Sequence, residues 1–417
     1  MSSKELVNQA LSHQEGSKIP VDFGGTTVTG MHCKVVEGLR NYYGLASKPV
    51  KVIEPYQMLG EIDEELQQII GIDTVSIFGP KDLFGINQEN YKEAITPWGQ
   101  KILIPMDYDF TPDSNNDVYV FPEGDRNCSP SGIMPDNCYF FNAIERQLPI
   151  DENVLIPDDN NEEYGLLSET DLQHFEKEAL KASQKGKCVV ASFGGTALGD
   201  VALIPGMSLK HPKGIRSVAE WYMATITQQD LIHQMFDKQI DIAISNYEKL
   251  WKRIGNNVDV IYLCGADFGT QNSQFCSVET FRSLWLPHYK RMTDWIHNHT
   301  SWKIFKHSCG SIVPLLPAML EAGFDIINPV QINAKGMDPV FLKKEFGKDI
   351  TFWGGGVDTQ IILPSAPSSK VYDHVLRQCE IMSKGGGFVF SSIHNIQANV
   401  PIENVVAMIN AVHDFNK

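Results

Sequence analysis

Short apolar runs alternate with amphipathic stretches through the second half of the chain. Six runs rich in β-branched residues predict buried strands, at residues 188–193, 258–264, 303–307, 325–330, 350–353 and 388–392. Stretches of helical periodicity lie between them, at 277–300, 312–322 and 369–383. Near-continuous apolar strands that alternate with helices are typical of a parallel sheet covered by helices on both faces.

An earlier run at residues 74–78 adds a seventh candidate strand. This number of strand–helix units predicts an α/β fold that closes into a (β/α)8 TIM barrel. An open, doubly wound sheet is the alternative architecture. No GxGxxG motif follows an early strand, which weakens that alternative as a nucleotide-binding fold.

Residues 86–165 depart from this rhythm. The stretch is acidic and rich in turn residues, and it contains the strand-like segments ILIPMDYDF and DVYVFPEGD. We therefore predict a single TIM-barrel domain over residues 1–417, with a β-rich cap region inserted at about 86–165 over one end of the barrel.

The charge balance narrows the classes of partner. The 417 residues include 35 Lys and Arg against 51 Asp and Glu, which gives a formal net charge of −16. A chain this acidic lacks the basic footprint of a nucleic-acid or anionic-membrane partner. No apolar run approaches the ~18 residues of a membrane span, and the N-terminal segment lacks the apolar core of a signal peptide. We expect a cytoplasmic protein.

One of the eight scattered cysteines differs from the others in its neighbours. His307-Ser308-Cys309 closes the predicted strand 303–307. In an extended segment, residues two apart face the same way, so His307 and Cys309 would share one face at the carboxyl end of a strand. A TIM barrel places its active site at that end, and imidazole nitrogen with thiolate suits zinc. A packed histidine beside a buried cysteine is the alternative.

A third zinc ligand would come from His394, which follows the last predicted strand much as His307 follows its own. Two strands of one barrel can converge at the same mouth. His307, Cys309 and His394 would then leave a fourth coordination position open, which is typical of a catalytic zinc site. A hydrogen-bonded loop histidine is the alternative for His394.

Further polar residues follow predicted strand ends. Asp267 and Asp358 are candidate catalytic groups that would orient ligands or move a proton, and His394 is a candidate proton donor. A helix N-cap is the alternative role of each aspartate. The candidate cofactor-binding residues at strand ends are Gln271, Asn328, Gln331 and Gly355. The glycines around Gly355 lack the Lys-Ser/Thr of a P-loop, so they would admit a ligand closely or pack strands tightly.

Several motifs together resemble the uroporphyrinogen decarboxylase superfamily, which also contains cobalamin-dependent methyltransferases. They read HSCGSIVPLLPAMLEAGFDIINPVQ, GMDPVFLKKEFGKDITFWGGGVDTQ and GGGFVFSSIHNIQANVPIENVVAMI, and the earlier segment KIPVDFGGTTVTG joins them. The resemblance covers residues 18–30 and most of 185–415. It implies a (β/α)8 barrel, in agreement with the strand rhythm.

The methyltransferases of that superfamily carry His-x-Cys after one strand and a further Cys after the last. His307 and Cys309 match the first motif, and His394 stands where the further Cys is expected. The resemblance implies zinc and transfer of a methyl group between a small substrate (thiol, methyl ether or methylamine) and a corrinoid such as methylcobalamin. No Asp-x-His-x-x-Gly motif occurs, so the corrinoid would arrive free or on a partner corrinoid protein. A homodimer is compatible with this interpretation.

The alternative activity is that of a decarboxylase (carboxy-lyase) acting on a porphyrinogen or a smaller acid. The decarboxylases carry two arginines shortly after the N-terminal Pro, but residues 21–26 contain none here and Arg40 is the first arginine. A chain of net charge −16 is poorly matched to a substrate with eight carboxylates. A barrel that only binds a corrinoid protein is the non-enzymatic alternative.

Overall fold

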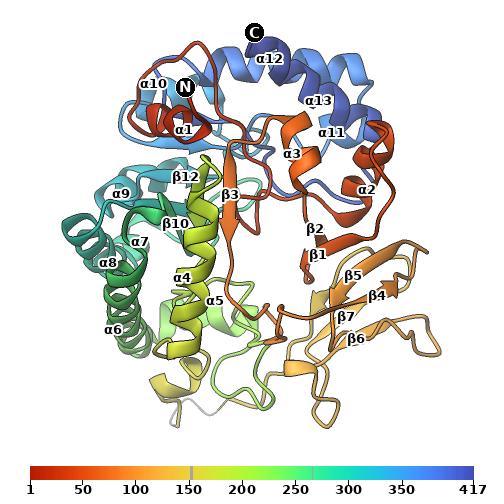
Figure 1. The fold of residues 1–417 in the computed structure, drawn as a ribbon. Helices are drawn as coiled ribbons and strands as arrows, with labels where there is room; N and C mark the ends of the chain where they lie inside the picture. Colours follow the sequence, from red (N-terminus) through yellow and green to blue (C-terminus); the bar gives the residue numbers. More distant parts are fainter. Residues whose placement is uncertain (151–153, 265) are drawn as a thin grey trace.

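The centre of the molecule is a seven-stranded parallel sheet that curls on itself (Figure 1). The computed structural model describes the whole chain except residues 151–153 and 265. The strands follow the order β14-β13-β12-β11-β10-β9-β3. Their bounds are β3 (Thr74–Ile77), β9 (Cys188–Ala191), β10 (Val260–Cys264), β11 (Lys303–His307), β12 (Ile326–Asn328), β13 (Thr351–Trp353) and β14 (Phe388–Val389). Each lies within a predicted run, so the seven strand predictions are confirmed.

The two edges of the curled sheet approach each other at residues 20–22. The Asp22 N–H donates to the Phe390 carbonyl and the Phe390 N–H to the Pro20 carbonyl, both at 2.8 Å, beside the end of β14. On the opposite side, the Asp73 N–H donates to the Val21 carbonyl at 2.8 Å, just before β3. The predicted eight-stranded barrel therefore has the form of a TIM-like curled sheet of seven strands. A single bridge residue, Val21, occupies the place of the eighth.

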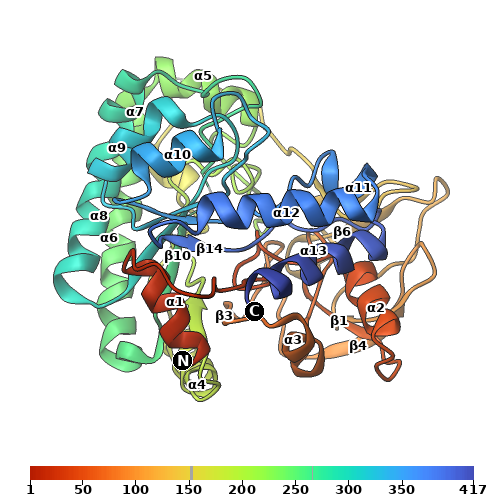
Figure 2. The same cartoon turned by 90° about the horizontal axis from the view of Figure 1, so that it is seen from above.

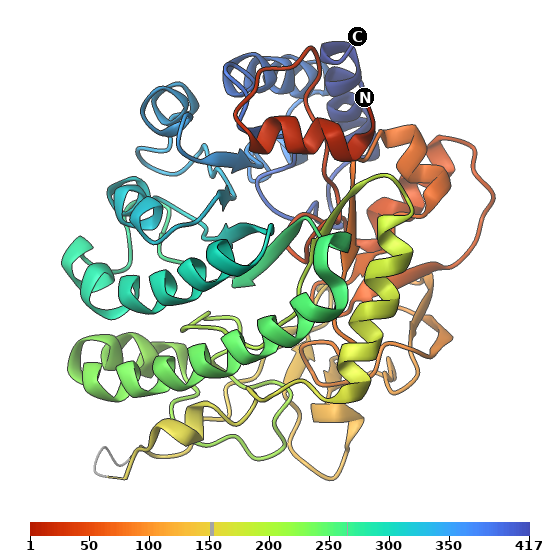
Figure 3. The same ribbon diagram turned by 60° about the vertical axis from the view of Figure 1, so that its left-hand side comes forward.

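Helices follow one another around the outside of the sheet in chain order (Figure 3). They are α4 (Glu169–Ser183), α5 (Val218–Thr227), α6 (Gln229–Ile254), α7 (Val278–Leu284), α8 (Leu286–His299), α9 (Leu316–Glu321), α10 (Pro339–Phe346), α11 (Ile362–Ser365), α12 (Ser368–Met382) and α13 (Ile402–Phe415). The predicted helix 277–300 is two helices, because Pro287 opens a new first turn after Trp285. Among the described residues, no helix combines the length and apolarity needed to cross a membrane.

Helix α1 (Ser3–Leu11) fills the amino end of the curled sheet. Ser2 and Glu5 form a capping box that starts this helix. Its apolar residues Val7, Ala10 and Leu11 pack in one cluster with buried strand residues. The strand members of this cluster are Cys188, Val190, Val260, Phe305, Ile326, Trp353 and Val389. Figure 2 shows α1 lying beside β14. Because the amino end is packed, the carboxyl ends of the strands are left for chemistry.

The region at 86–165 contains short strands and lies to one side of the curled sheet (Figure 1). Its strands are β4 (Tyr91–Ile95), β5 (Lys101–Pro105), β6 (Val118–Val120), β7 (Gly132–Met134) and β8 (Asn142–Ala143). Strand β5 also pairs with β1 (Val50–Glu54), and β2 (Leu59–Gly60) completes a four-stranded sheet in the order β2-β1-β5-β4. Helices α2 (Cys33–Tyr42) and α3 (Glu64–Ile70) precede the region. Its role as a cap stays a prediction, and residues 151–153 of it lie outside the described residues.

Candidate metal centre

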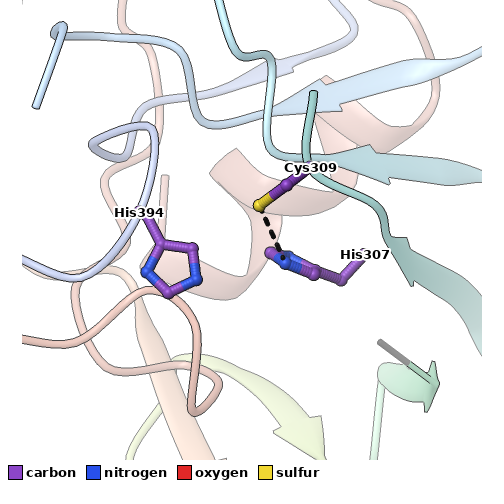
Figure 4. Close-up of side chains that lie close together, drawn as sticks. All are labelled: His307, Cys309 and His394. Carbon is purple, nitrogen blue, oxygen red and sulfur yellow. Dashed lines mark hydrogen bonds between the residues drawn. The ribbon is translucent and has the colours of Figure 1, made fainter. Parts of the chain in front are cut away.

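The three predicted metal ligands lie together at the carboxyl end of the curled sheet (Figure 4). His307 is the last residue of β11, and the Cys309 Sγ lies 3.4 Å from the His307 Nε2. His394 comes from the loop after β14, and its ring centroid is 5.5 Å from that of His307. One nitrogen or sulfur atom from each residue lies within 4.8 Å of the other two. The topology thus brings together residues that are 87 positions apart in the chain.

Asn328 fixes which nitrogen of His307 carries the proton. The Asn328 Nδ2 donates to the Trp353 carbonyl at 2.8 Å, so its Oδ1 must face the imidazole. The His307 Nδ1 therefore donates to that oxygen, at 2.6 Å. The lone pair is left on Nε2, which faces the Cys309 thiol. Asn328, predicted as a cofactor-binding residue, orients a candidate ligand in this arrangement.

Burial keeps both histidines neutral at physiological pH. It lowers the pKa of His307 to about 4, against the Asn328 hydrogen bond. Burial also lowers the pKa of His394 to about 4, and the neighbouring His307 adds to the effect. Neutral imidazole is the form that binds metal, so neither group needs to lose a proton first.

The pKa of the Cys309 thiol is shifted in the opposite direction from those of the two histidines. Burial, reinforced by the Asp267 carboxylate, raises the pKa of Cys309 well above the ordinary thiol value. The Lys306 ammonium opposes this effect but does not overcome it, so the thiol holds its proton. A metal ion is the usual agent that ionises such a thiol, because the thiolate is the ligand.

Asp267 lies at the edge of the three candidate ligands. Its Oδ1 accepts a hydrogen bond from the Cys309 N–H at 2.6 Å and is 3.7 Å from the His307 Nε2. Burial raises the pKa of this carboxyl group. The loop after β10 thus places a carboxylate beside the candidate ligands, as the sequence predicted.

A second carboxylate near this site was not among the sequence candidates. Burial and then Asp267 raise the pKa of Tyr222 to about 12, and Asp200, in the loop after β9, adds to this effect. Asp200 also adds to the effect of burial and Asp267 on the pKa of Cys309. Both effects place its charge within electrostatic reach of the site. The sequence carried little signal for it, because Asp200 lies nine residues beyond the end of β9, whereas Asp267 lies three residues beyond the end of β10.

Gln271 and Gln331 connect the loops around the site. The Gln331 Oε1 accepts from the Gly310 N–H at 2.7 Å, and its Nε2 donates to the Gln271 Oε1 at 3.0 Å. Gln271 in turn donates to the Asn333 carbonyl at 2.5 Å. Both side-chain amides, predicted to bind a cofactor, therefore hold together the loops that follow β10, β11 and β12.

Asp358 and Gly355 occupy the end of β13. The Asp358 Oδ1 accepts from the N–H groups of Gln360 and Ile361, at 2.8 and 3.2 Å, just before α11. Gly355 has a φ of +81°, and a Cβ added there would lie 2.7 Å from the Val330 Cβ. In the described residues, neither forms a hydrogen bond with His307, Cys309 or His394. Asp358 therefore forms a turn before α11 and not the helix cap weighed for it, because the N-cap of α11 is Ile361. Tight packing, the alternative weighed for Gly355, accounts for its contact with Val330.

The sequence profile of the family described as uroporphyrinogen decarboxylase (URO-D) matches residues 208–415. The chain belongs to the uroporphyrinogen decarboxylase superfamily. The matched residues include β10 to β14 and all three candidate ligands. Among curated proteins, none matches this chain.

One solved structure shares the fold of this chain. A structure described as a methyltransferase from Methanosarcina mazei is similar over 100% of this chain and 100% of its own, with a TM-score of 0.57 and 14% sequence identity. At this identity the likeness shows the fold alone. D-psicose 3-epimerase with D-fructose (TM-score 0.30, 9% identity, 62% of this chain and 84% of that one) is much less similar. So is an iminocyclitol complex of endo-glycoceramidase II from Rhodococcus sp. (TM-score 0.35, 11% identity, 62% and 68%). Neither score supports an argument.

Proposed function

We propose that this member of the superfamily is a zinc-dependent methyltransferase. It would move a methyl group between a small substrate, which is a thiol, a methyl ether or a methylamine, and a corrinoid. The observation that carries the proposal is the convergence of His307, Cys309 and His394 at the carboxyl ends of the strands. Two imidazoles and one thiol form a donor set that suits zinc, with a fourth position left for a substrate.

The donor atoms fit this metal in spacing and protonation. Two ligands of a tetrahedral zinc ion lie about 3.5 Å apart, and Cys309 Sγ and His307 Nε2 are separated by 3.4 Å. The Nε2 lone pair of His307 faces the shared space, because Asn328 holds the proton on Nδ1. The published name of the Methanosarcina structure, a methyltransferase, is consistent with the proposal.

The residues of the chain would divide the work as follows. Zinc, when bound, would act as a Lewis acid on the heteroatom of the small substrate. His307 and His394 would bind as neutral ligands and Cys309 as the thiolate. Asp267, whose carboxyl group lies against the Cys309 N–H, would hold or move the proton that the thiol or the substrate releases.

The β-rich region at 86–165 and the preceding β1–β2 turn would cover the substrate side. Gln57, in that turn, accepts a hydrogen bond from the Asn395 Nδ2 at 2.7 Å, and Asn395 follows His394 directly. We propose that this region caps the site or docks a corrinoid protein. Since the chain lacks a corrinoid-binding Asp-x-His-x-x-Gly motif, the corrinoid would come free or on that partner.

The profile match itself favours a second candidate, a carboxy-lyase. The segment that would bind substrate carboxylates has another task here. Asp22 lies fully buried and accepts hydrogen bonds from the Trp353 indole at 2.8 Å and the Thr74 hydroxyl at 2.6 Å. Burial raises the pKa of this carboxyl group, and residues 21–26 contain no arginine or lysine, which counts against recognition of a polycarboxylate.

The test is methyl transfer by the purified, zinc-supplemented chain. Methylcobalamin with a panel of thiols, and reduced cobalamin with methyl ethers and methylamines, would be followed by the absorbance of the corrinoid. We expect turnover with one of these substrates, lost in His307→Ala and kept within about twofold in Cys128→Ala. Porphyrinogen decarboxylation without any corrinoid reaction would support the carboxy-lyase instead.

A further inference from the structure

Lys306 is a fully buried lysine in β11, directly before the candidate ligand His307. Its ammonium group donates hydrogen bonds to the backbone carbonyl of Ala266, at 2.6 Å, and to that of His307. The ring centroids of Phe268 and Tyr289 lie 5.3 and 5.9 Å from the ammonium nitrogen. In the described part of the chain, this ammonium group forms no ion pair, so its partners are two carbonyls and two aromatic rings.

The burial of this charge has a cost that the stability of the fold does not explain. Removing an ammonium group from water costs free energy, and hydrogen bonds to carbonyls together with contacts to aromatic faces recover only part of it. Replacement of buried ionic groups by apolar side chains of similar volume is often neutral or stabilising. Lys306→Met would keep an unbranched side chain in the same space. A role in the neighbouring metal centre therefore accounts for this lysine better than a role in the core.

Both carbonyls that Lys306 contacts belong to the backbone around the candidate metal centre. Ala266 directly precedes Asp267, whose Oδ1 accepts the hydrogen bond from the Cys309 N–H at 2.6 Å. His307 is itself a candidate ligand, and its Nε2 lies 3.4 Å from the Cys309 Sγ. One ammonium group thus connects the start of the loop after β10 with the end of β11.

Other contacts join the loops after β10 and β11 without the help of Lys306. The Phe268 N–H donates to the Ser308 Oγ at 2.9 Å. At Gly269 the two backbones approach so closely that an added Cβ would lie 2.7 Å from the Cys309 carbonyl oxygen. Because these contacts do not involve the ammonium group, a variant without it should still fold and keep the two loops adjacent.

We propose that Lys306 is a positioning residue of the metal centre. With its ammonium group bound to both carbonyls, the backbone before Asp267 stays fixed against the end of β11. Asp267 then meets the Cys309 N–H, and the Cys309 Sγ keeps its place beside the His307 Nε2. The lysine contributes to the geometry of zinc binding and not to the stability of the fold. This role of Lys306 rests on the proposed function, since it requires zinc at the site.

The experiment compares Lys306→Met with Lys303→Met, which removes a partly exposed lysine of the same strand that pairs with Asp325 at 3.0 Å. Lys306→Met should weaken zinc binding about tenfold or more, measured by competition with a chromophoric chelator, and Lys303→Met should change it less than about twofold. With Co²⁺ in place of zinc, the visible absorption bands should change only in Lys306→Met, because they report the geometry of the ligands. Metal-free Lys306→Met should unfold at a denaturant concentration no lower than that of the original chain.

Weaker zinc binding, an altered cobalt spectrum and undiminished stability together support the proposal. An unchanged zinc affinity or an unchanged cobalt spectrum in Lys306→Met overturns it. The proposal is equally overturned if Lys306→Met fails to fold or unfolds at a lower denaturant concentration, because the lysine would then be needed for the fold. If the original chain binds no zinc, the proposed function fails as well, whereas the other negative outcomes remove only the role of Lys306.

Discussion

The segments that follow β11 and β13 both leave the sheet at its carboxyl end, and both carry polar groups and glycine. At the end of β11, the His307 Nε2 and the Cys309 Sγ, two residues later, face each other across 3.4 Å. After β13, the Asp358 carboxylate instead accepts two backbone N–H groups of its own loop, and Gly355 packs against Val330.

The two strand ends differ in the hydrogen-bond partners of their polar side chains, Asp358 and His307. Asp358 accepts from backbone N–H groups two and three residues away, which is the usual role of an aspartate in a turn, and from the Asn333 amide at 3.1 Å. The Nδ1 of His307 is satisfied from β12, which leaves its Nε2 facing the shared space. A polar residue at a strand end is thus a candidate metal ligand or catalytic group when one of its side-chain nitrogen, oxygen or sulfur atoms is not used in hydrogen bonds within its own loop.

The largest effect is expected when a candidate ligand is removed after β11. Cys309→Ala should weaken zinc binding by about a thousandfold, because one of three protein ligands is lost. Competition with a chromophoric chelator measures this affinity. Cys128→Ala, a cysteine of the β-rich region, serves as control and should change it less than about twofold. Equal zinc affinity in the Cys309→Ala and Cys128→Ala variants would show that Cys309 is not a zinc ligand.

A smaller loss is expected from the residue that orients His307. Asn328→Leu should weaken zinc binding by about 10- to 100-fold, since the imidazole loses the acceptor that holds its proton on Nδ1. Asn333→Leu is the matched control, because that amide donates to Asp358 and Gln360 instead. The same zinc titration applies, with circular dichroism to verify folding. An unaltered affinity in Asn328→Leu contradicts the assigned tautomer.

The pH dependence of zinc binding should show that one proton is released for each zinc ion bound. Burial raises the pKa of Cys309, so its thiol must release a proton on binding at every pH from about 5.5 to 8. His307 and His394, with pKa values of about 4, are already neutral there. The association constant should therefore rise about tenfold per pH unit and steepen only toward pH 4. A slope near three over this range would mean that the histidines are charged.

The smallest effect belongs to the end of β13. Asp358→Ala should lower the free energy of unfolding by about 1 kcal/mol, because the turn loses the acceptor of two backbone N–H groups. Zinc affinity should stay within about twofold of the original value. Denaturant unfolding and the chelator titration measure the two quantities. A tenfold loss of zinc affinity in this variant would contradict the claim that the end of β11 takes part in zinc binding and the end of β13 does not.

Periodicity predicted much of this architecture, because buried parallel strands are nearly continuous apolar runs. The pair His307 and Cys309 followed from the two-residue repeat of an extended chain. Asn328 was found as a strand-end residue, but its role depends on the Trp353 carbonyl and hence on the pairing of β12 with β13. Asp200 was missed, since only the folded chain shows that its loop lies near Cys309.

The break between α7 and α8 is another feature that sequence periodicity did not predict. An amphipathic pattern continues across residues 277–300, and only the proline in the first turn of α8 divides it. The eighth strand was also beyond periodicity, because a single bridge residue carries no repeat. In both places the course of the backbone depends on a single residue, which a periodic pattern cannot predict.

The central claim is that His307, Cys309 and His394 bind one metal ion together. Zinc K-edge X-ray absorption of the zinc-loaded protein tests it most directly, because this method counts sulfur and nitrogen ligands. We predict one sulfur at about 2.3 Å and two imidazole nitrogens at about 2.0 Å, with a light atom in the fourth position. In His394→Ala one imidazole should disappear. A spectrum without sulfur, or with two imidazoles still present in His394→Ala, would contradict the account.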